Sequence, residues 1–187
     1  MRGEWCYFKS YFSKEYCNSI LERSKDLEFK KANLGEDGLT QIENYRKSDV
    51  TWLFPHDFPD LYDEIWKLER EANQKWFGFH IDNLEYIQLA KYDGDIQGEY
   101  KRHKDVFWIN NSERHRKLSA VVQLSDPDDY EGGDLTFFQC TEYPNKEDIR
   151  QQGTVTFFPA FIDHQANPVL KGTRYSMAIW FEGPKWR

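Results

Sequence analysis

Two histidines and one aspartate in the second half of the chain have the types and spacing of metal ligands. Only one residue separates His103 from Asp105, so in an extended segment both side chains point to the same side. An imidazole nitrogen and a carboxylate oxygen are two of the three ligands of a 2-His-1-carboxylate site, which leaves positions open on iron. The third ligand must come from a distant segment, and His164 follows a strongly apolar run and a proline. We therefore predict a metal site formed by these three residues.

A lone arginine stands at the start of the last apolar run, GTRYSMAIW. A buried strand seldom begins with a residue such as Arg174 unless the guanidinium has a partner. The guanidinium is a planar fork that matches a carboxylate bidentately. Two partners fit this pattern, namely the distal carboxylate of a bound 2-oxoglutarate and an internal salt bridge to Asp163 or Glu182. By alternation along the strand, Ser176 and Trp180 point to the same face and are expected to line the same pocket, although Trp180 fits a core position equally well.

The first half of the chain contains the predicted helices. Ser13 can cap a helix over Glu15–Lys25, and a second helix is expected to start near Pro59. The apolar residues that follow this proline recur at helical spacing. They are Leu61, Ile65, Leu68 and Ala72.

From about Leu84 the pattern changes to short β-branched and aromatic runs, separated by Gly, Asp, Asn and Pro. Helices first and strands afterwards predict an α+β, mainly β class, with a double-stranded β-helix (jelly roll) core supported by N-terminal helices. Another β-sandwich is also compatible with this pattern. We expect one domain over residues 1–187, with a helical part over about 1–80 and the jelly-roll core over about 84–184. The runs are LEYIQLAKY, LSAVVQLS, DLTFFQC, GTVTFFP and RYSMAIWF.

Composition limits the classes of function and the compartment. The aromatic share of 17% favours a sheet-rich fold, and the formal net charge of −7 argues against a nucleic-acid partner. Three cysteines without a CxxC pair are typical of a reducing compartment. The N-terminus has no apolar signal-peptide core, and no apolar run reaches the length of a membrane span. A cytoplasmic location without a membrane partner is expected.

The order of the candidate residues resembles a known family. It is similar to the prolyl-4-hydroxylase-like branch of the Fe(II)/2-oxoglutarate dioxygenases over about residues 84–184. The stretches LSAVVQLSDPDDYEGGDLTF and PVLKGTRYSMAIWFEGP look like the small bacterial and phage members called PKHD-type hydroxylases. The landmarks are, in order, Tyr92, Gly94, Tyr100-x-x-His103-x-Asp105, Gly132-Gly133-Asp134-Leu135, His164 and Arg174.

This resemblance implies roles for individual residues and a set of cofactors. Fe(II), 2-oxoglutarate and O2 are implied, with ascorbate as a candidate reductant. His103, Asp105 and His164 would hold iron, and Arg174 would bind the C5 carboxylate of 2-oxoglutarate. Tyr92 matches the tyrosine that donates to the same carboxylate. The cosubstrate contacts that the resemblance leaves open are Tyr100 as a competing donor, Gln123 as a further contact, and Ser176 and Trp180 in the pocket wall.

The resemblance also ranks the possible reactions. A carboxylate at Asp105 favours hydroxylation over halogenation, and Trp180 stands where related nucleic-acid demethylases carry a second arginine. The leading hypothesis is an enzyme that hydroxylates an unactivated C–H bond, with peptidyl proline as the favoured substrate. Hydroxylation of a free amino acid or other small metabolite is one alternative. A non-catalytic jelly-roll protein that binds a partner is another.

Further residues are assigned to the surroundings of the site. The aromatic side chains of Phe107, Trp108 and Phe138 are expected to keep the cavity dry. Substrate specificity is expected in three polar segments, Leu34–Asp49, Asn110–Arg116 and Tyr143–Gln152. The remaining histidines are interpreted as surface or ordinary hydrogen-bonded residues. They are His56, His80 and His115.

Overall fold

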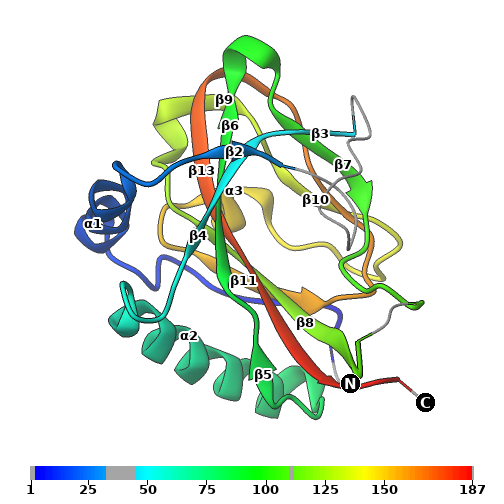
Figure 1. Ribbon diagram of the computed structural model, residues 1–187. Coiled ribbons are helices and arrows are strands. Elements are labelled where there is room, and N and C mark those ends of the chain that lie inside the picture. Colours follow the sequence, from blue (N-terminus) through cyan, green and yellow to red (C-terminus); the bar gives the residue numbers. More distant parts are fainter. Residues whose placement is uncertain (1–2, 33–44, 110–111, 187) are drawn as a thin grey trace.

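The computed structural model describes residues 3–32, 45–109 and 112–186 (Figure 1). The helical segments are α1 (Lys14–Ser24), α2 (Pro59–Ala72), the π-helical turn Asn73–Phe77, α3 (Lys146–Arg150) and the short 3-10 turns Gly94–Ile96 and Pro127–Asp129. The strands are β1 (Cys6–Phe8), β2 (Lys30–Lys31), β3 (Arg46–Lys47), β4 (Asp49–Leu53), β5 (Asn83–Leu84), β6 (Ile87–Asp93), β7 (Glu99–His103), β8 (Arg114–Gln123), β9 (Tyr130–Gly132), β10 (Leu135–Phe137), β11 (Val155–Pro159), β12 (His164–Ala166) and β13 (Val169–Pro184).

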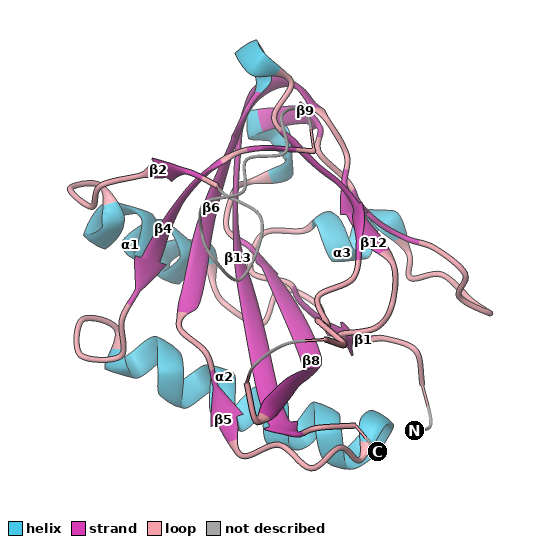
Figure 2. Cartoon of the chain, turned by 45° about the vertical axis from the view of Figure 1, so that its right-hand side comes forward, coloured by secondary structure: helices cyan, strands magenta, loops and turns pink. Residues whose placement is uncertain are grey.

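Two antiparallel sheets form the core of the fold. The larger sheet has the order β1-β11-β8-β13-β6-β4-β2, and the smaller has the order β10-β12-β7-β3. Strands β5 and β9 also pair with β13, so this long strand organises the larger sheet. Figure 2 shows β4, β6, β13 and β8 side by side, with α1 and α2 lying away from β12. The architecture confirms the predicted mainly β class with a jelly-roll core.

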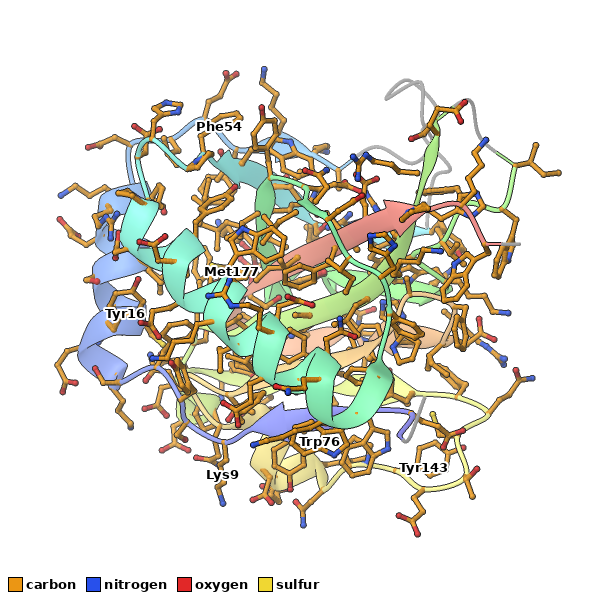
Figure 3. All side chains as sticks on the ribbon, turned by 90° about the horizontal axis from the view of Figure 1, so that it is seen from below. Lys9, Tyr16, Phe54, Trp76, Tyr143 and Met177 are labelled. Atoms are coloured by element: carbon orange, nitrogen blue, oxygen red, sulfur yellow. The ribbon has the colours of Figure 1, made fainter. Side chains whose placement is uncertain are left out.

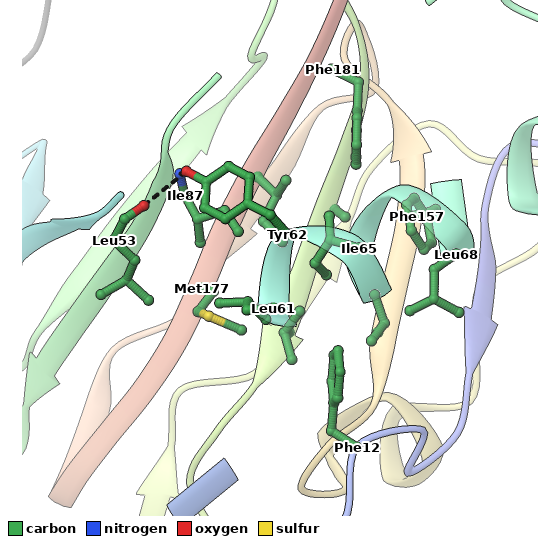
Figure 4. Packing of buried hydrophobic residues seen from close by; sticks show 14 of the residues in the cluster. Phe12, Leu53, Leu61, Tyr62, Ile65, Leu68, Ile87, Phe157, Met177 and Phe181 are labelled. Carbon is green, nitrogen blue, oxygen red and sulfur yellow. Dashed lines mark hydrogen bonds between the residues drawn. The ribbon is translucent and has the colours of Figure 1, made fainter. Parts of the chain in front are cut away.

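The face of the larger sheet that carries the helices holds the main apolar core. Leu61, Ile65 and Leu68 of α2 pack with Met177 and other fully buried side chains of the sheet (Figure 4). The Tyr62 hydroxyl donates to the carbonyl of Leu53 at 2.8 Å and accepts from the amide of Ile87 at 3.0 Å, which ties α2 to β4 and β6. Within the part of the chain that the structure describes, none of the helices is both long and apolar enough to cross a membrane.

The helices predicted from the sequence are present with nearly the expected limits. The Ser13 hydroxyl accepts from the amide of Tyr16 and caps α1, and α2 begins at Pro59. The N-terminal part is not only helical. It also contributes β1 and β4 to the larger sheet and β3 to the smaller sheet. These strands have only two to five residues, too few for alternation to be recognised in the sequence.

Candidate functional site

The three predicted metal ligands meet between the two sheets. His103 ends β7 and lies directly opposite His164, the first residue of β12. Asp105 follows β7 in a turn, where its amide donates to the carbonyl of Ala160 at 2.9 Å. One ligand atom from each of the three side chains lies within 4.8 Å of the other two. The predicted convergence is therefore present, although Asp105 reaches the site from a turn and not from a continuing strand.

Hydrogen bonds fix which atoms face the centre of this cluster. The Nδ1 atoms of His103 and His164 lie 2.7 Å and 3.0 Å from the backbone carbonyls of Lys101 and Ile162. A carbonyl only accepts, so each Nδ1 carries a proton, and in the neutral imidazole Nε2 then keeps the free lone pair. The two Nε2 atoms lie 3.6 Å and 3.5 Å from the Asp105 carboxylate.

Ser119 of β8 holds the carboxylate from the other side. Its hydroxyl donates to Oδ2 of Asp105 at 2.6 Å, and both side chains are buried. One carboxylate oxygen therefore has a hydrogen-bond donor of its own, while the other accepts no hydrogen bond from the residues that the structure describes. This arrangement favours ligation through a single oxygen.

The charge states also suit a divalent cation. Burial lowers the pKa of His164 to about 4, so this imidazole is neutral near pH 7. Burial alone would raise the pKa of Asp105, but the adjacent His164 and His103, with Arg116 farther off, lower it below its usual range. Two imidazoles and one carboxylate are a donor set for a first-row transition metal. The residues present therefore fit the iron that the sequence predicts.

Arg174 lies buried in the same cavity as the three metal ligands. It is 1% exposed, and its Nε donates to Oε1 of Gln123 at 3.2 Å. It stands directly opposite Tyr92 in the sheet, with the guanidinium carbon 5.3 Å from the centre of that ring. A charged side chain this deeply buried needs an anionic partner.

The internal salt bridge considered for Arg174 is absent. Asp163 pairs with Arg102 at 2.8 Å, and Glu182 accepts a hydrogen bond from Asn83 at 2.8 Å. Among the residues that the structure describes, none of the ion pairs involves Arg174. Its environment therefore fits a small bound carboxylate better than a structural ion pair.

A narrow cavity of about 40 Å³ connects the cluster to Arg174. Its wall includes most of the residues predicted from the sequence, whereas Gln123 stands behind Arg174 and holds it in place. The Tyr100 ring stacks on His103, with centroids 3.5 Å apart, while Tyr92 is the tyrosine beside Arg174. The predicted wall residues are Tyr92, Tyr100, His103, Asp105, His164, Arg174, Ser176 and Trp180.

The prediction that three aromatic side chains line this cavity is wrong. Phe107 and Trp108 are 42% and 54% exposed, and Phe138 packs under the guanidinium of Arg102 at 4.6 Å. None of the three belongs to the cavity wall. They lie on loops, so the alternation used for strand residues does not apply to them.

Two arginines from the segments expected to set specificity, to which the sequence assigned no individual role, lie at or beside the site. Arg46 of β3 lines the cavity, donates to Oε1 of Gln88 at 2.7 Å and lies over the Tyr100 ring. Arg116 of β8 forms a bidentate pair with Glu85 and lies 4.0 Å from the centre of the Trp180 ring. Sheet pairing places Arg46 in the cavity wall, opposite Tyr100, whereas Arg116 lies beside the wall residue Trp180.

The outlying predictions have mixed outcomes. His56 is exposed, whereas His115 is buried and accepts from the amide of Trp186 at 3.2 Å. Of the three expected specificity segments, residues 34–44 and 110–111 lie outside the described residues. Tyr143–Gln152 contains α3, away from the cavity wall.

Comparison with known proteins adds sequence relatives. Residues 87–182, just over half of the chain, match the model of the 2OG-Fe(II) oxygenase superfamily. A PKHD-type hydroxylase of Pseudomonas putida is 34% identical over 56% of this chain and 37% of the relative. Another from Pseudoalteromonas atlantica is 38% identical over 51% of this chain and 42% of the relative. The chain thus matches well under half the length of these curated relatives.

Solved structures show the same fold over nearly the whole chain. A viral collagen prolyl hydroxylase from Paramecium bursaria Chlorella virus-1 has a TM-score of 0.71 at 21% identity and covers 96% of each chain. A prolyl hydroxylase from Trichoplax adhaerens, in complex with a hypoxia inducible factor peptide fragment, has a TM-score of 0.77 at 16% identity. It covers 96% of this chain and 83% of its own.

Proposed function

This chain belongs to the 2OG-Fe(II) oxygenase superfamily, and on that premise we propose that it is an iron(II)- and 2-oxoglutarate-dependent dioxygenase that hydroxylates an unactivated C–H bond. One observation carries the proposal: His103, Asp105 and His164 converge within 4.8 Å in the same narrow cavity as Arg174, a buried arginine without an ion-pair partner among the described residues. A site for a cation and a site for an anion are thus joined in one space.

The three ligand side chains would hold iron(II). When bound, iron(II) supplies the activation of O2, coupled to decarboxylation of 2-oxoglutarate to succinate and carbon dioxide. The backbone carbonyls of Lys101 and Ile162 hold both imidazoles in the tautomer that presents Nε2. Ser119 keeps one oxygen of Asp105 occupied, so that the carboxylate takes up a single position. These contacts orient the ligands before any metal arrives.

Arg174 and Tyr92 would bind the C5 carboxylate of 2-oxoglutarate. The guanidinium is held at Nε by Gln123, so its other nitrogens are the ones available to a carboxylate. Tyr92, opposite Arg174 in the sheet, is the better placed of the two candidate tyrosines, because the Tyr100 ring is stacked on His103. Burial of this end strengthens the charge pair and excludes water from it.

Peptidyl proline is the substrate that we favour. The support is the PKHD-type hydroxylase relatives and the prolyl hydroxylase fold, one example of which carries a bound peptide fragment. A free amino acid or small metabolite is the second candidate. A non-catalytic binding role is disfavoured because all three metal ligands and the buried arginine are present in one cavity.

Replacing a ligand tests the metal site. In His103→Ala we expect Fe(II)-dependent formation of succinate from 2-oxoglutarate to fall more than about 100-fold, because the loss of groups that only orient ligands already costs about 10–100-fold. Mn(II) binding to the metal-free protein, measured calorimetrically, should weaken in parallel. His56→Ala, at an exposed histidine, is the matched control. Undiminished turnover in His103→Ala would disprove the assignment.

The same assay addresses cofactor and substrate choice. Assays with and without ascorbate test the predicted reductant. Activity should decline more slowly over repeated turnovers when ascorbate is present. Prolyl peptides and free amino acids, compared as stimulants of succinate formation, distinguish the two substrate classes. Stimulation by free amino acids alone would exclude the peptidyl substrate.

A further inference from the structure

A second arginine of the cavity wall has no carboxylate partner. The Nε of Arg46 donates to the Ser48 hydroxyl at 2.9 Å, and its Nη2 donates to Oε1 of Gln88 at 2.7 Å. The guanidinium carbon lies 4.4 Å from the centre of the Tyr100 ring. All three of these partners are neutral, and within the described residues no carboxylate lies within ion-pair distance of Arg46. A positive charge and further N–H groups thus remain for a ligand.

Arg46 and Arg174 mark different parts of the cavity. Gln88, which holds Arg46, lies opposite Ala178 in the sheet, and Ala178 is four residues beyond Arg174 on β13. Both Gln88 and Ala178 face the cavity, whereas Met177, the residue before Ala178, points to α2 (Figure 3). Four residues of a strand span about 13 Å. A carboxylate held by Arg174 therefore lies away from Arg46, which leaves Arg46 for the substrate.

Arg46 is also close to the metal ligands. The Tyr100 ring stacks on His103 with centroids 3.5 Å apart, so one face of this ring is covered. Arg46 therefore lies on the other face. A single aromatic ring separates the guanidinium from a ligand of iron. A substrate whose C–H group faces the metal can thus place a carboxylate, a few bonds away, at Arg46.

The charges of the cavity wall leave one positive charge unmatched. Besides the two histidines, the charged residues of the wall are Arg46, Asp105 and Arg174, so their net charge is +1. The two positive charges of iron(II) and the two negative charges of 2-oxoglutarate cancel and do not change this balance. Arg116 lies beside the wall but is matched by Glu85 at 2.6 Å. An unmatched charge away from water is unfavourable, and an anionic substrate removes it.

We propose that Arg46 binds a carboxylate of the substrate, and that substrates of this site carry a negative charge close to the C–H group that reacts. The inference rests on the proposed hydroxylase function and narrows its substrate class. An acidic residue of a polypeptide and the α-carboxylate of a free amino acid both offer this group. A guanidinium recognises either of them by the same charge-assisted hydrogen bonds.

A binding experiment with matched probes tests the role of Arg46. The protein is loaded with Mn(II) and 2-oxoglutarate, so that binding is measured calorimetrically without turnover. One pair of probes is acetyl-Asp-Pro-Asp-amide and acetyl-Asn-Pro-Asn-amide, and the other is L-proline and L-prolinamide. In at least one pair, wild-type protein should bind the carboxylate about 10- to 100-fold more tightly than the amide. The pair that shows this preference identifies the source of the carboxylate.

Variants of Arg46 assign the preference to this side chain. Arg46→Gln should bind the carboxylate and the amide of that pair equally, while an unchanged dissociation constant for 2-oxoglutarate shows that the fold is intact. Arg46→Lys keeps the charge without the planar fork, so its preference should lie between those of the wild type and Arg46→Gln.

Lys47→Gln is the matched control variant. Lys47 is the next residue on β3, lies outside the cavity wall and pairs with Glu99 at 3.6 Å. Its replacement removes the same charge from the opposite side of the strand, so the preference should stay unchanged.

Three results would overturn the proposal. The first is that wild-type protein binds both members of each pair with equal affinity, or binds none of the four probes. The second is that Arg46→Gln keeps the preference for the carboxylate. The third is that Arg46→Gln loses affinity for 2-oxoglutarate to the same extent, which would place Arg46 at the cosubstrate.

Turnover with Fe(II) separates this inference from the proposed function. With the preferred probe as substrate, Arg46→Gln should raise KM about tenfold or more and change kcat little, because the lost contact binds substrate and transition state alike. If the carboxylate probes bind through Arg46 but no 2-oxoglutarate is consumed, the hydroxylase function fails and Arg46 keeps its role. If the amide probes are hydroxylated as efficiently as the carboxylates, the role of Arg46 fails and the hydroxylase function stands.

Discussion

The two faces of strand β13 differ in chemistry, because only the cavity face carries buried polar side chains. Residues that point to the helices are Met177, Ile179 and Phe181, all apolar and without solvent exposure. The alternate residues face the cavity, and at the Arg174 end of the strand they are polar yet buried; the polar pair is Arg174 and Ser176, and Ala178 and Trp180 continue the row. One strand therefore supplies packing on one side and binding groups on the other.

The difference shows how this fold supports a charged site. Burial of apolar side chains against α2 stabilises the sheet, since each fully buried large side chain contributes about 1.5–3 kcal/mol. The polar face lacks such packing and keeps Arg174 in a place where only a ligand can complete its contacts. We expect substitutions on the cavity face to change ligand affinity, and substitutions on the helix face to change stability.

The largest effect is expected for Arg174→Ala. Loss of a buried, hydrogen-bonded charge pair costs about 2–5 kcal/mol, so the dissociation constant of 2-oxoglutarate should rise tens- to thousands-fold. Calorimetric titration of 2-oxoglutarate into the Mn(II)-loaded protein measures this change. Arg174→Lys is the control, because it keeps the charge but loses the planar fork. Its dissociation constant for 2-oxoglutarate should lie between those of the wild type and Arg174→Ala. An unchanged affinity in Arg174→Ala would mean that Arg174 stabilises the fold and does not bind 2-oxoglutarate.

On the opposite face, Ile179→Ala should lower the free energy of unfolding by about 3 kcal/mol, because it leaves a cavity in the core. The folded protein should keep its affinity for 2-oxoglutarate, since the side chain points to α2 and away from Arg174. Urea denaturation and the same titration test both statements. A loss of affinity as large as the loss of stability would show that the two faces are coupled.

A smaller effect is expected at Glu69, a buried polar residue of α2, the helix that packs against the apolar face of the sheet. It is 3% exposed, its Oε1 has no hydrogen-bond partner, and burial raises its pKa from 4.5 to about 7. Between these values the folded protein holds a proton that the unfolded chain has released, so stability falls as the pH rises from about 4.5 to about 7.

Glu69→Gln removes this titration. Unfolding free energies should therefore rise by about 1–3 kcal/mol at pH 8 and change little near pH 5. Denaturation midpoints at the two pH values measure the difference. Glu71→Gln, on the same helix in an exposed pair with Lys75, should show little change at either pH. Equal shifts at both pH values would indicate a packing effect instead.

Local sequence was enough for the helices and for the strands with long apolar runs. Ser13 and Pro59 marked the helix starts correctly, because capping depends on the immediate neighbours. The extent of β6 was less predictable, since Glu85 and Tyr86 separate it from β5. Strands β1, β3 and β4 escaped prediction because each has only two to five residues, too few for alternation to be recognised.

The sequence by itself determined the chemical groups of this protein: two imidazoles, a carboxylate and a guanidinium, in an order that resembles one family. Their convergence was implied by that order, but their orientation was not. Only the tertiary structure decided that Ser119 holds Asp105, that Gln123 holds Arg174, and that Asp163 and Glu182 have other partners. These contacts join residues 14 to 99 positions apart, and sheet register, which no local pattern encodes, brings them together.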